Sequence, residues 1–323
     1  MVKSSDGYKP ESGYLKEKLN SMKELKAPEV PEFDFEEYSP LLDSANIVPD
    51  NWVAIARDIA RKYNDYDGFI ILHGTDTMAY TASALSFMLQ GLQKPVIITG
   101  SQLPLGKVRN DGRGNLITSM ILAGNYDIPE VCLFFNDRLL RGCRSVKVNA
   151  NDFQAFSSPD FPPLGTVGVD INLNENLFLE KRKKSFNYTR IASHSIAVLQ
   201  IFPGISATVL DNILSPPLQG LILQTYGQGN IPHNNKKLIS VIKKATTRGI
   251  IITACTQNLS GTVRLQTYET GYALKEAGVI SGFDITTEAA LAKLYFLFSL
   301  NLSQQKIKQK FMKSLCGELS KNK

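Results

Sequence analysis

The sequence predicts an α/β protein with two domains, each built on an open, mainly parallel β-sheet. Short apolar runs alternate with amphipathic segments along most of the chain, as expected for buried parallel strands between helices. The 323 residues favour two domains, because one domain usually holds about 100–200 residues. A polar, poorly periodic stretch at 172–194 divides the pattern. We therefore expect domains at 1–171 and 195–323, joined by this linker.

The composition is that of an ordinary folded protein. Apolar residues make up 43% and charged residues 20% of the chain, which excludes collagen-like, coiled-coil and disordered proteins. The formal net charge is +6, but the positive charge is spread along the chain, so we expect no nucleic-acid partner. No apolar run reaches the length of about 18 residues that a membrane helix needs, so no membrane partner is expected either.

The cysteines are typical of a reducing compartment. Cys132, Cys143, Cys255 and Cys316 are scattered, form no Cys-x-x-Cys pair and have no histidine near two of them. This spacing does not predict a zinc site. Free thiols and a polar N-terminus without the apolar core of a signal peptide predict a cytoplasmic location.

The first predicted domain contains a clear strand–helix–strand unit. Apolar runs predict strands at 68–72 and 96–99, and a helix with one apolar stripe is predicted between them at 77–92. The other predicted elements are helices at 13–25, 49–63 and 112–123 and strands at 33–35 and 131–135. The second domain repeats the alternation, with strands at 196–202, 220–224 and 250–254 and helices at 207–214, 236–246 and 288–300.

Several polar loops follow the predicted strands, where open parallel sheets bind their ligands. These loops are 43–45, 73–77, 99–102 and 136–149. They contain hydroxyl groups, a carboxylate and a lysine, but neither a histidine cluster nor a phosphate-binding glycine loop. A threonine, an aspartate and a lysine suit acyl transfer by a hydroxyl group, with the lysine as base and the aspartate holding the lysine.

Each of these residues also has an ordinary structural interpretation. Thr75 or Thr77 could cap the helix that follows, and Asp76 could interact with the dipole of that helix. Other candidates could be surface, turn or core side chains: Lys147, Ser44, His73 and Tyr8. From the residue types alone, the prediction stops at a small-molecule α/β enzyme with a hydroxyl-rich site.

One segment is more specific. Gly68-Phe-Ile-Ile-Leu-His-Gly-Thr-Asp-Thr-Met78 resembles the second signature of the bacterial-type L-asparaginase family at all eleven positions. Further segments resemble the cytoplasmic type I branch of that family: 78–88, 94–101, 202–206, 270–271 and 278–280. The resemblance covers both domains and implies a larger flavodoxin-like or Rossmann-like N-terminal domain and a smaller Rossmann-like C-terminal domain.

The resemblance implies an amidohydrolase that converts L-asparagine to L-aspartate and ammonia through a threonine nucleophile. Thr75 would be the second catalytic threonine, Lys147 would deprotonate it, and Asp76 would hold this pair. Tyr8 would close over the site as a mobile catalytic residue. The implied substrate-binding residues are Asp43, Ser44, Ala45, Thr75, Asp76 and Asn230, the last in a loop that a partner subunit lends to the site. No metal or organic cofactor is implied, and the expected assembly is a homodimer or homotetramer.

One part of the family pattern is missing from the sequence. The first signature is an apolar strand followed by Thr-Gly-Gly-Thr-Ile-Gly, which the 323 residues do not contain. Its last threonine is the family's primary nucleophile. The segment 1–8 resembles the residues that follow this signature, so we expect a mis-set start codon or a clipped gene. The 323-residue form is then expected to have little or no activity, because loss of a nucleophile costs several orders of magnitude in rate.

Two other functions remain open at this point. A catalytically dead homologue could keep Ser44 and Asp76 and bind asparagine or aspartate without cleaving it. A glutaminase-like subunit of a tRNA-dependent amidotransferase is also similar to the family, but it would need a further domain and a partner chain. The choice between asparagine and glutamine also stays open, because one methylene group in a pocket is worth only about 1–3 kcal/mol.

Overall fold

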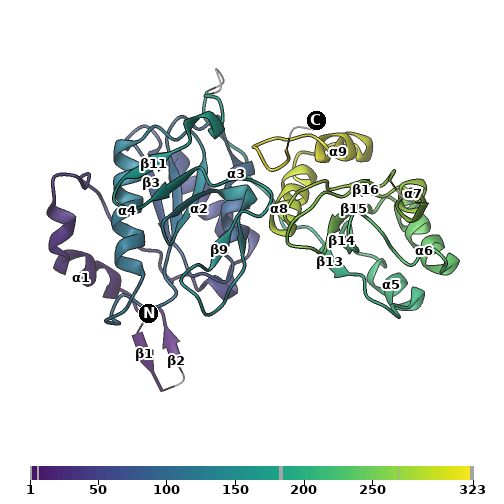
Figure 1. Cartoon of the computed structure of the whole chain (residues 1–323), viewed down its shortest axis with the longest axis horizontal. Coiled ribbons are helices and arrows are strands. Elements are labelled where there is room, and N and C mark those ends of the chain that lie inside the picture. The colour runs from purple at the N-terminus through teal and green to yellow at the C-terminus, as the bar shows by residue number, and fades with distance from the viewer. Residues whose placement is uncertain (1, 6, 182–184, 268, 321–323) are drawn as a thin grey trace. The chain divides into compact units, whose positions relative to one another are not determined.

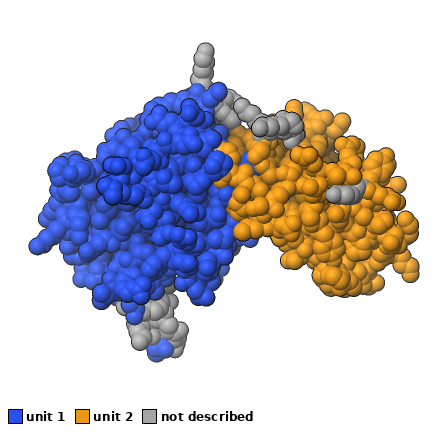
Figure 2. All heavy atoms as spheres, viewed as in Figure 1, with its two compact units in different colours: residues 1–158, 162–189 blue, residues 159–161, 190–323 orange. Residues whose placement is uncertain are grey.

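The structure is a computed structural model that describes residues 2–5, 7–181, 185–267 and 269–320 (Figure 1). The chain divides into two compact units, which Figure 2 colours separately. Unit 1 comprises residues 1–158 and 162–189, and unit 2 comprises 159–161 and 190–323. Each unit contains a β-sheet with helices packed against it, so the predicted two-domain α/β class is confirmed.

Unit 1 is built on a six-stranded sheet with the order β11-β10-β7-β6-β5-β3. The predicted strands β3 (Phe69–Leu72), β5 (Val96–Thr99) and β6 (Val131–Phe135) are present and pair in parallel. The other strands run antiparallel to their neighbours: β7 (Arg138–Arg141), β10 (Gly165–Val167) and β11 (Ile171–Leu173). The reversal begins at Asn136 and Asp137, whose positive φ angles of 43° and 64° suit a two-residue hairpin turn.

The helices of unit 1 follow the predicted pattern. They are α1 (Tyr14–Ser21), α2 (Pro49–Lys62), α3 (Met78–Met88) and α4 (Gly112–Asn125). Pro49 occupies the first turn of α2, as predicted, and the Asn51 side chain accepts a hydrogen bond of 2.8 Å from the Val48 amide. Every residue of α3 except Tyr80 is buried, so this helix is enclosed on all sides.

Unit 1 also contains short elements that connect the sheet and the helices. Two-residue strands form small ribbons, in which β4 (Leu89–Gln90) pairs with β12 (Asn187–Tyr188) and β8 (Val146–Lys147) pairs with β9 (Phe156–Ser157). At the N-terminal side, β1 (Val2–Ser4) pairs with β2 (Gly7–Lys9). Short 3₁₀ helices complete the unit: η1 (Lys23–Lys26), η2 (Ser44–Asn46), η3 (Gly142–Arg144) and η4 (Glu175–Leu177).

Two expectations differ from the structure of unit 1. The predicted strand at 33–35 is wrong, since the chain there is irregular and Phe35 packs against a helical cluster that includes Leu19 and Met120. The stretch 172–194 was expected to be a linker, but residues up to 189 belong to unit 1. Strands β11 and β12 lie in this stretch, and backbone pairing with β10 and β4 holds them there despite their polar side chains.

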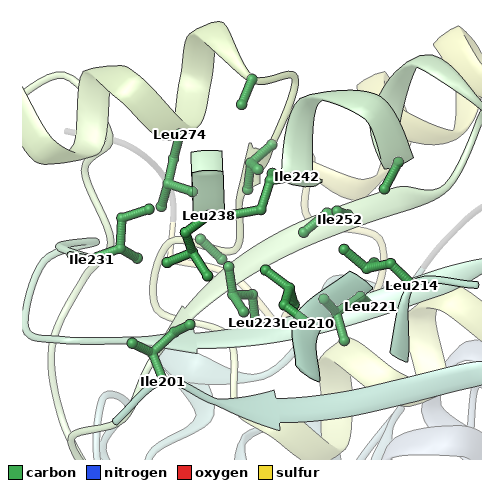
Figure 3. Close-up of a cluster of buried hydrophobic side chains, with 14 of the residues drawn as sticks. Ile201, Leu210, Leu214, Leu221, Leu223, Ile231, Leu238, Ile242, Ile252 and Leu274 are labelled. Atoms are coloured by element: carbon green, nitrogen blue, oxygen red, sulfur yellow. The ribbon is translucent and has the colours of Figure 1, made fainter. Parts of the chain in front are cut away.

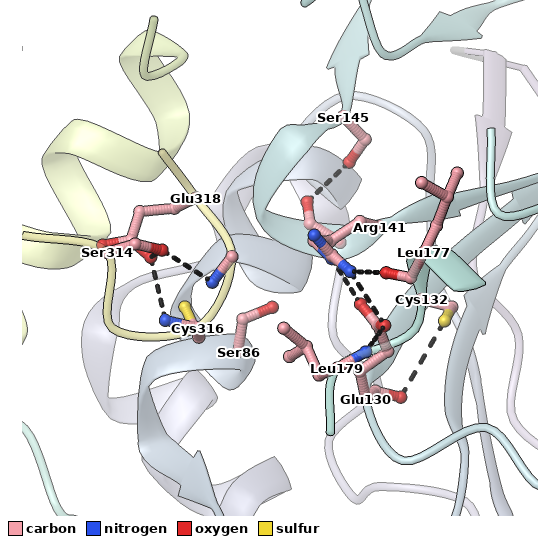
Figure 4. Close-up of polar contacts among 12 residues, drawn as sticks. Ser86, Glu130, Cys132, Arg141, Ser145, Leu177, Leu179, Ser314, Cys316 and Glu318 are labelled. Carbon is pink, nitrogen blue, oxygen red and sulfur yellow. Dashed lines mark hydrogen bonds and ion pairs between the residues drawn. The ribbon is translucent and has the colours of Figure 1, made fainter. Parts of the chain in front are cut away.

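A buried ion pair anchors part of this stretch (Figure 4). The Arg141 guanidinium donates to the Glu130 carboxylate at 2.6 and 3.1 Å, and both side chains are almost completely buried. Arg141 also donates to the Leu177 carbonyl at 2.6 Å, and Glu130 accepts from the Leu179 amide at 2.9 Å. Both charges are therefore satisfied, and the backbone at 177–179 is fixed to strands β6 and β7.

Unit 2 is built on a fully parallel sheet of four strands. Its order is β13 (Ile196–Gln200), β14 (Gly220–Thr225), β15 (Ile251–Thr256) and β16 (Ile280–Ser281). The helices are α5 (Ala207–Ile213), α6 (Lys236–Thr247), α7 (Glu269–Glu276), α8 (Thr287–Phe298) and α9 (Gln304–Phe311). Figure 3 shows Leu210, Leu238 and Leu274 from α5, α6 and α7 packed with the apolar side chains of the central strands.

The elements α7, α9 and β16 were not predicted from the sequence, because they are short and carry few apolar residues. Within the described ranges, every helix is too short or too polar to cross a lipid bilayer.

Candidate active site

The carboxyl ends of strands β3 and β5 lie side by side and carry the central part of the site. The His73 amide donates to the Thr99 carbonyl at 2.9 Å, which extends the parallel pairing by one residue beyond β3. A Cβ atom at Gly100 would lie 2.1 Å from the His73 carbonyl oxygen, so only glycine allows this close approach. The loop 73–77 is thereby held above the sheet edge before α3 begins.

The Lys147 amine joins this loop from a different part of the chain. Lys147 lies in the small ribbon of β8 and β9, and its Nζ donates to Thr75 Oγ1 at 2.9 Å and to Asp76 Oδ1 at 2.8 Å. The Lys147 side chain is 22% exposed and that of Asp76 is 64% exposed. The interpretation of Lys147 as a solvated surface residue is therefore wrong. One amine therefore lies within hydrogen-bonding distance of a hydroxyl group and of an accessible carboxylate, an arrangement that allows a proton to pass between Thr75 and Lys147.

Ser44 lies against the same loop. It is 7% exposed, and a Cβ atom at Gly74 would lie 2.4 Å from its Oγ. The Thr77 hydroxyl donates to the Ser44 carbonyl at 2.6 Å, so Thr77 contacts Ser44 instead of capping α3. Beside Ser44, the Asp43 carboxylate accepts from the Ala45 amide at 3.2 Å and caps the 3₁₀ helix η2. The segments 43–45 and 73–77 are thus in direct contact with each other.

His73 is a packed histidine, which agrees with its interpretation as a core side chain. Its Nδ1 lies 2.7 Å from the Gly74 carbonyl oxygen and its Nε2 lies 2.9 Å from Thr81 Oγ1. Burial lowers the pKa of His73 below its ordinary value, and the hydrogen bond with Gly74 opposes this only in part. Both ring nitrogens are occupied within the protein.

Two further predicted site residues lie in other parts of the chain. Tyr8 lies in strand β2, and its side chain is outside the described part of the structure. Asn230 belongs to unit 2, where it closes the turn 226–230 and its Oδ1 accepts a hydrogen bond from the Thr270 hydroxyl.

Sequence reasoning did not identify the residues that hold the loop following Lys147. Gln102 donates through Nε2 to the carbonyl oxygens of Ala150 and Asp152, both at 3.1 Å. The backbone amide of Gln102 donates in turn to the Asp111 carboxylate at 2.8 Å. The loop 99–102, which contains Gln102, was predicted as a site loop because it follows a strand. Nothing in the sequence indicated which groups the Gln102 side chain contacts. Among the residues that the structure describes, no group of three or more His, Cys, Asp or Glu could hold a metal ion.

The fold and this cluster define a class of protein. A hydroxyl, an amine and a carboxylate in contact beside the end of a parallel strand are groups that suit acyl transfer in a hydrolase. The chain belongs to the asparaginase family, an amidohydrolase family. The family model for the asparaginase N-terminal domain matches residues 1–179, and that for the glutaminase/asparaginase C-terminal domain matches residues 195–311. The predicted resemblance is therefore confirmed.

Individual relatives agree with this assignment. L-asparaginase 1 of Escherichia coli K12 is 48% identical over 320 residues, which cover 99% of this chain and 94% of the relative. The crystal structure of L-asparaginase I from Vibrio cholerae matches with a TM-score of 0.92 and 50% identity, covering 96% of this chain and 94% of that one. The thermostable L-asparaginase of Thermococcus kodakarensis matches with a TM-score of 0.89 and 30% identity, covering 99% and 96%.

Proposed function

We propose that this chain, when it follows the family's first signature, hydrolyses L-asparagine to L-aspartate and ammonia by acyl transfer through threonine hydroxyl groups. The observation that supports this most directly is the position of the Lys147 amine between Thr75 Oγ1 and Asp76 Oδ1, at 2.9 and 2.8 Å. The similarity to relatives named L-asparaginase supports the choice of substrate.

In the proposed reaction, Lys147 acts on Thr75. Lys147 accepts the hydroxyl proton of Thr75 through its Nζ, and Asp76 keeps the amine directed at that hydroxyl. The threonine of the family's first signature attacks the side-chain amide carbon and passes its own hydroxyl proton to Thr75, which also orients the leaving ammonia or the water molecule. The C–N bond breaks, ammonia leaves with the proton held by Lys147, and water hydrolyses the resulting ester and so restores the threonine hydroxyl. One water molecule is consumed and one ammonia is released.

Substrate binding uses the segments 43–45 and 73–77. We assign the α-carboxylate of asparagine to the Ser44 hydroxyl beside Asp43 and Ala45. The α-amino group is assigned to Asp76, whose carboxylate is exposed enough to meet a ligand. Tyr8 is proposed to cover the bound substrate, and Asn230 is proposed to reach the site from a partner subunit in a homodimer or homotetramer. The free thiols of the four cysteines support a cytoplasmic location.

The role of the attacking threonine can be tested by adding it, because the 323 residues contain no Thr-Gly-Gly-Thr segment. Two proteins are compared: the 323-residue chain and an "extended chain", in which the same residues follow an apolar strand and Thr-Gly-Gly-Thr-Ile-Gly. We expect ammonia release from asparagine by the extended chain only. Equal turnover by both would show that the attacking group lies within the 323 residues.

A second candidate function is binding of asparagine or aspartate without cleavage. The buried Ser44 and the exposed Asp76 would serve such a protein equally well. Calorimetry separates the two functions. Heat of binding for aspartate together with no ammonia release from either chain would favour the binding protein over the hydrolase.

A further inference from the structure

Behind the loop 73–77, three polar side chains from three different elements form a chain of hydrogen bonds. Trp52 in α2 donates through Nε1 to Thr81 Oγ1 in α3 at 3.0 Å. Thr81 Oγ1 lies 2.9 Å from Nε2 of His73, which follows β3. The other ring nitrogen of His73 lies 2.7 Å from the carbonyl oxygen of Gly74, the residue before Thr75. Trp52 is 5% exposed and Thr81 is completely buried.

The direction of each hydrogen bond follows from the groups that make it. The indole N–H of Trp52 can only donate, and the carbonyl of Gly74 can only accept. Nδ1 of His73 must therefore carry a proton. In a neutral imidazole Nε2 is then an acceptor, so the Thr81 hydroxyl directs its proton to it. Every group in the series donates to the next one, from Trp52 through Thr81 and His73 to Gly74.

We propose that His73 is a positioning residue for Thr75, held as the neutral Nδ1–H tautomer by Thr81 and Trp52. Its Nδ1–H fixes the carbonyl of the Gly74–Thr75 peptide, and this determines where the Thr75 hydroxyl meets Lys147. The tautomer of His73 does not depend on the proposed function. The effect of His73 on catalysis rests on that function.

Two further observations support this role. Burial lowers the pKa of His73, which favours the neutral ring with Nε2 available as an acceptor. Ser44 also lies against Gly74, because even a single added carbon atom would lie 2.4 Å from Ser44 Oγ. The residue before Thr75 is thus in contact with Ser44 at its Cα and with the His73 ring at its carbonyl oxygen.

The tautomer can be observed without any activity. Long-range ¹H–¹⁵N spectra of the ¹⁵N-labelled 323-residue protein would report it for each of the three histidines, and the His73→Asn spectrum would identify the His73 signals. We expect the Nδ1–H tautomer from pH 6.5 to 8 in the wild type and a mixture of tautomers in Thr81→Val. An Nε2–H tautomer or a rapidly exchanging ring in the wild type would overturn the proposal.

The positioning effect is measured in the extended chain. Thr81→Val keeps the shape of Thr81 but removes the hydroxyl, and we expect kcat to fall about tenfold while KM changes less than about threefold. Thr81→Ser should restore kcat to within about twofold, because the hydroxyl returns. His194→Asn is the matched control, since His194 contacts Gln219 and Ser299 in unit 2 and should leave kcat unchanged.

The outcomes separate the two proposals. If the extended wild-type chain releases no ammonia, the proposed function fails, and the spectra still decide the role of His73. In that case Thr81→Val should shift the ¹⁵N amide resonance of Thr75, because the carbonyl of its peptide loses a fixed donor. An unchanged Thr75 resonance, or an unchanged kcat in an active chain, would refute positioning by His73.

Discussion

The Lys147 amine lies 2.9 Å from the Thr75 hydroxyl although 72 positions separate the two residues in the chain. The contact depends on two local structures. Gly100 allows the loop 73–77 to pass over the end of β5, and the β8–β9 ribbon presents Lys147 to that loop. Either structure can be disturbed without touching the reacting groups, which makes the arrangement testable.

Replacing Lys147 should abolish the reaction but leave the fold intact. Lys147→Met keeps the length of the aliphatic side chain and removes the amine. We expect ammonia release by the extended chain to fall at least about 10³-fold, because the base for Thr75 is lost. The melting temperature should change little, since the ion pair with Asp76 is partly exposed. Lys275→Met, an exposed change in α7, is the control, and equal losses in both variants would contradict the role of Lys147.

Gly74 should tolerate no side chain. In Gly74→Ala the added Cβ would meet Ser44 Oγ at 2.4 Å and Ser44 Cβ at 2.7 Å. We expect the free energy of unfolding to fall by about 1–3 kcal/mol, and KM for asparagine to rise as Ser44 moves. Gly114→Ala in α4 is the matched control, because its Cβ would meet nothing within 4 Å. It should stabilise the helix by up to about 1 kcal/mol. Equal stability of the two variants would disprove the contact.

Gln102 should control the mobility of the loop that follows Lys147. Gln102→Ala removes two hydrogen bonds to the backbone of that loop, each worth about 0.5–1.5 kcal/mol. Amide hydrogen exchange in 148–155 should then accelerate, and kcat of the extended chain should fall because Lys147 is less well held. Gln305→Ala changes an exposed glutamine of α9 in unit 2 and should alter neither quantity. Unchanged exchange after Gln102→Ala would show that the ribbon alone holds the loop.

A buried ion pair should make the stability of unit 2 depend on acid pH. Lys293 and Glu318 are completely buried and lie 2.5 Å apart. Burial alone would raise the pKa of Glu318, but Lys293 and the backbone amide of Cys316 outweigh it and hold this pKa below its ordinary value of 4.5. The stabilisation is therefore complete above pH 4.5 and is lost as the pH falls through the lower folded-state pKa.

Thermal unfolding between pH 3 and 6 measures this contribution. The wild-type protein should lose stability towards the acid end, and Glu318→Gln should be less stable at pH 6 with a weaker dependence on pH. Lys293→Met should destabilise by about 3–5 kcal/mol, because it leaves a buried carboxylate without its partner. The double variant Lys293→Met/Glu318→Gln should recover part of that loss. Identical pH profiles for the wild type and Glu318→Gln would exclude Glu318 as the titrating group.

The sequence predicted the parts of the fold whose signal is local. Apolar runs identified β3, β5 and β6, and Pro49 identified the first turn of α2. The strands β7, β10 and β11 were missed because their stability comes from pairing with segments distant in the chain, which no local periodicity reveals. The strand at 33–35 was predicted wrongly because apolar and polar residues alternate around Asp34, as they do in a strand. In the structure Phe35 packs against helices and the segment pairs with no strand that the structure describes.

For the site, the sequence alone determined that Thr75 and Asp76 follow the strand β3, and it identified the family to which this pattern belongs. Only the tertiary structure decided that Lys147 meets Thr75, that Thr77 contacts Ser44 and that His73 is bonded at both nitrogens. These contacts join residues up to 72 positions apart, and hydrogen bonds form over about 3 Å. Such a distance is set by how sheet, ribbon and helices pack together, and not by the residues on either side of each group.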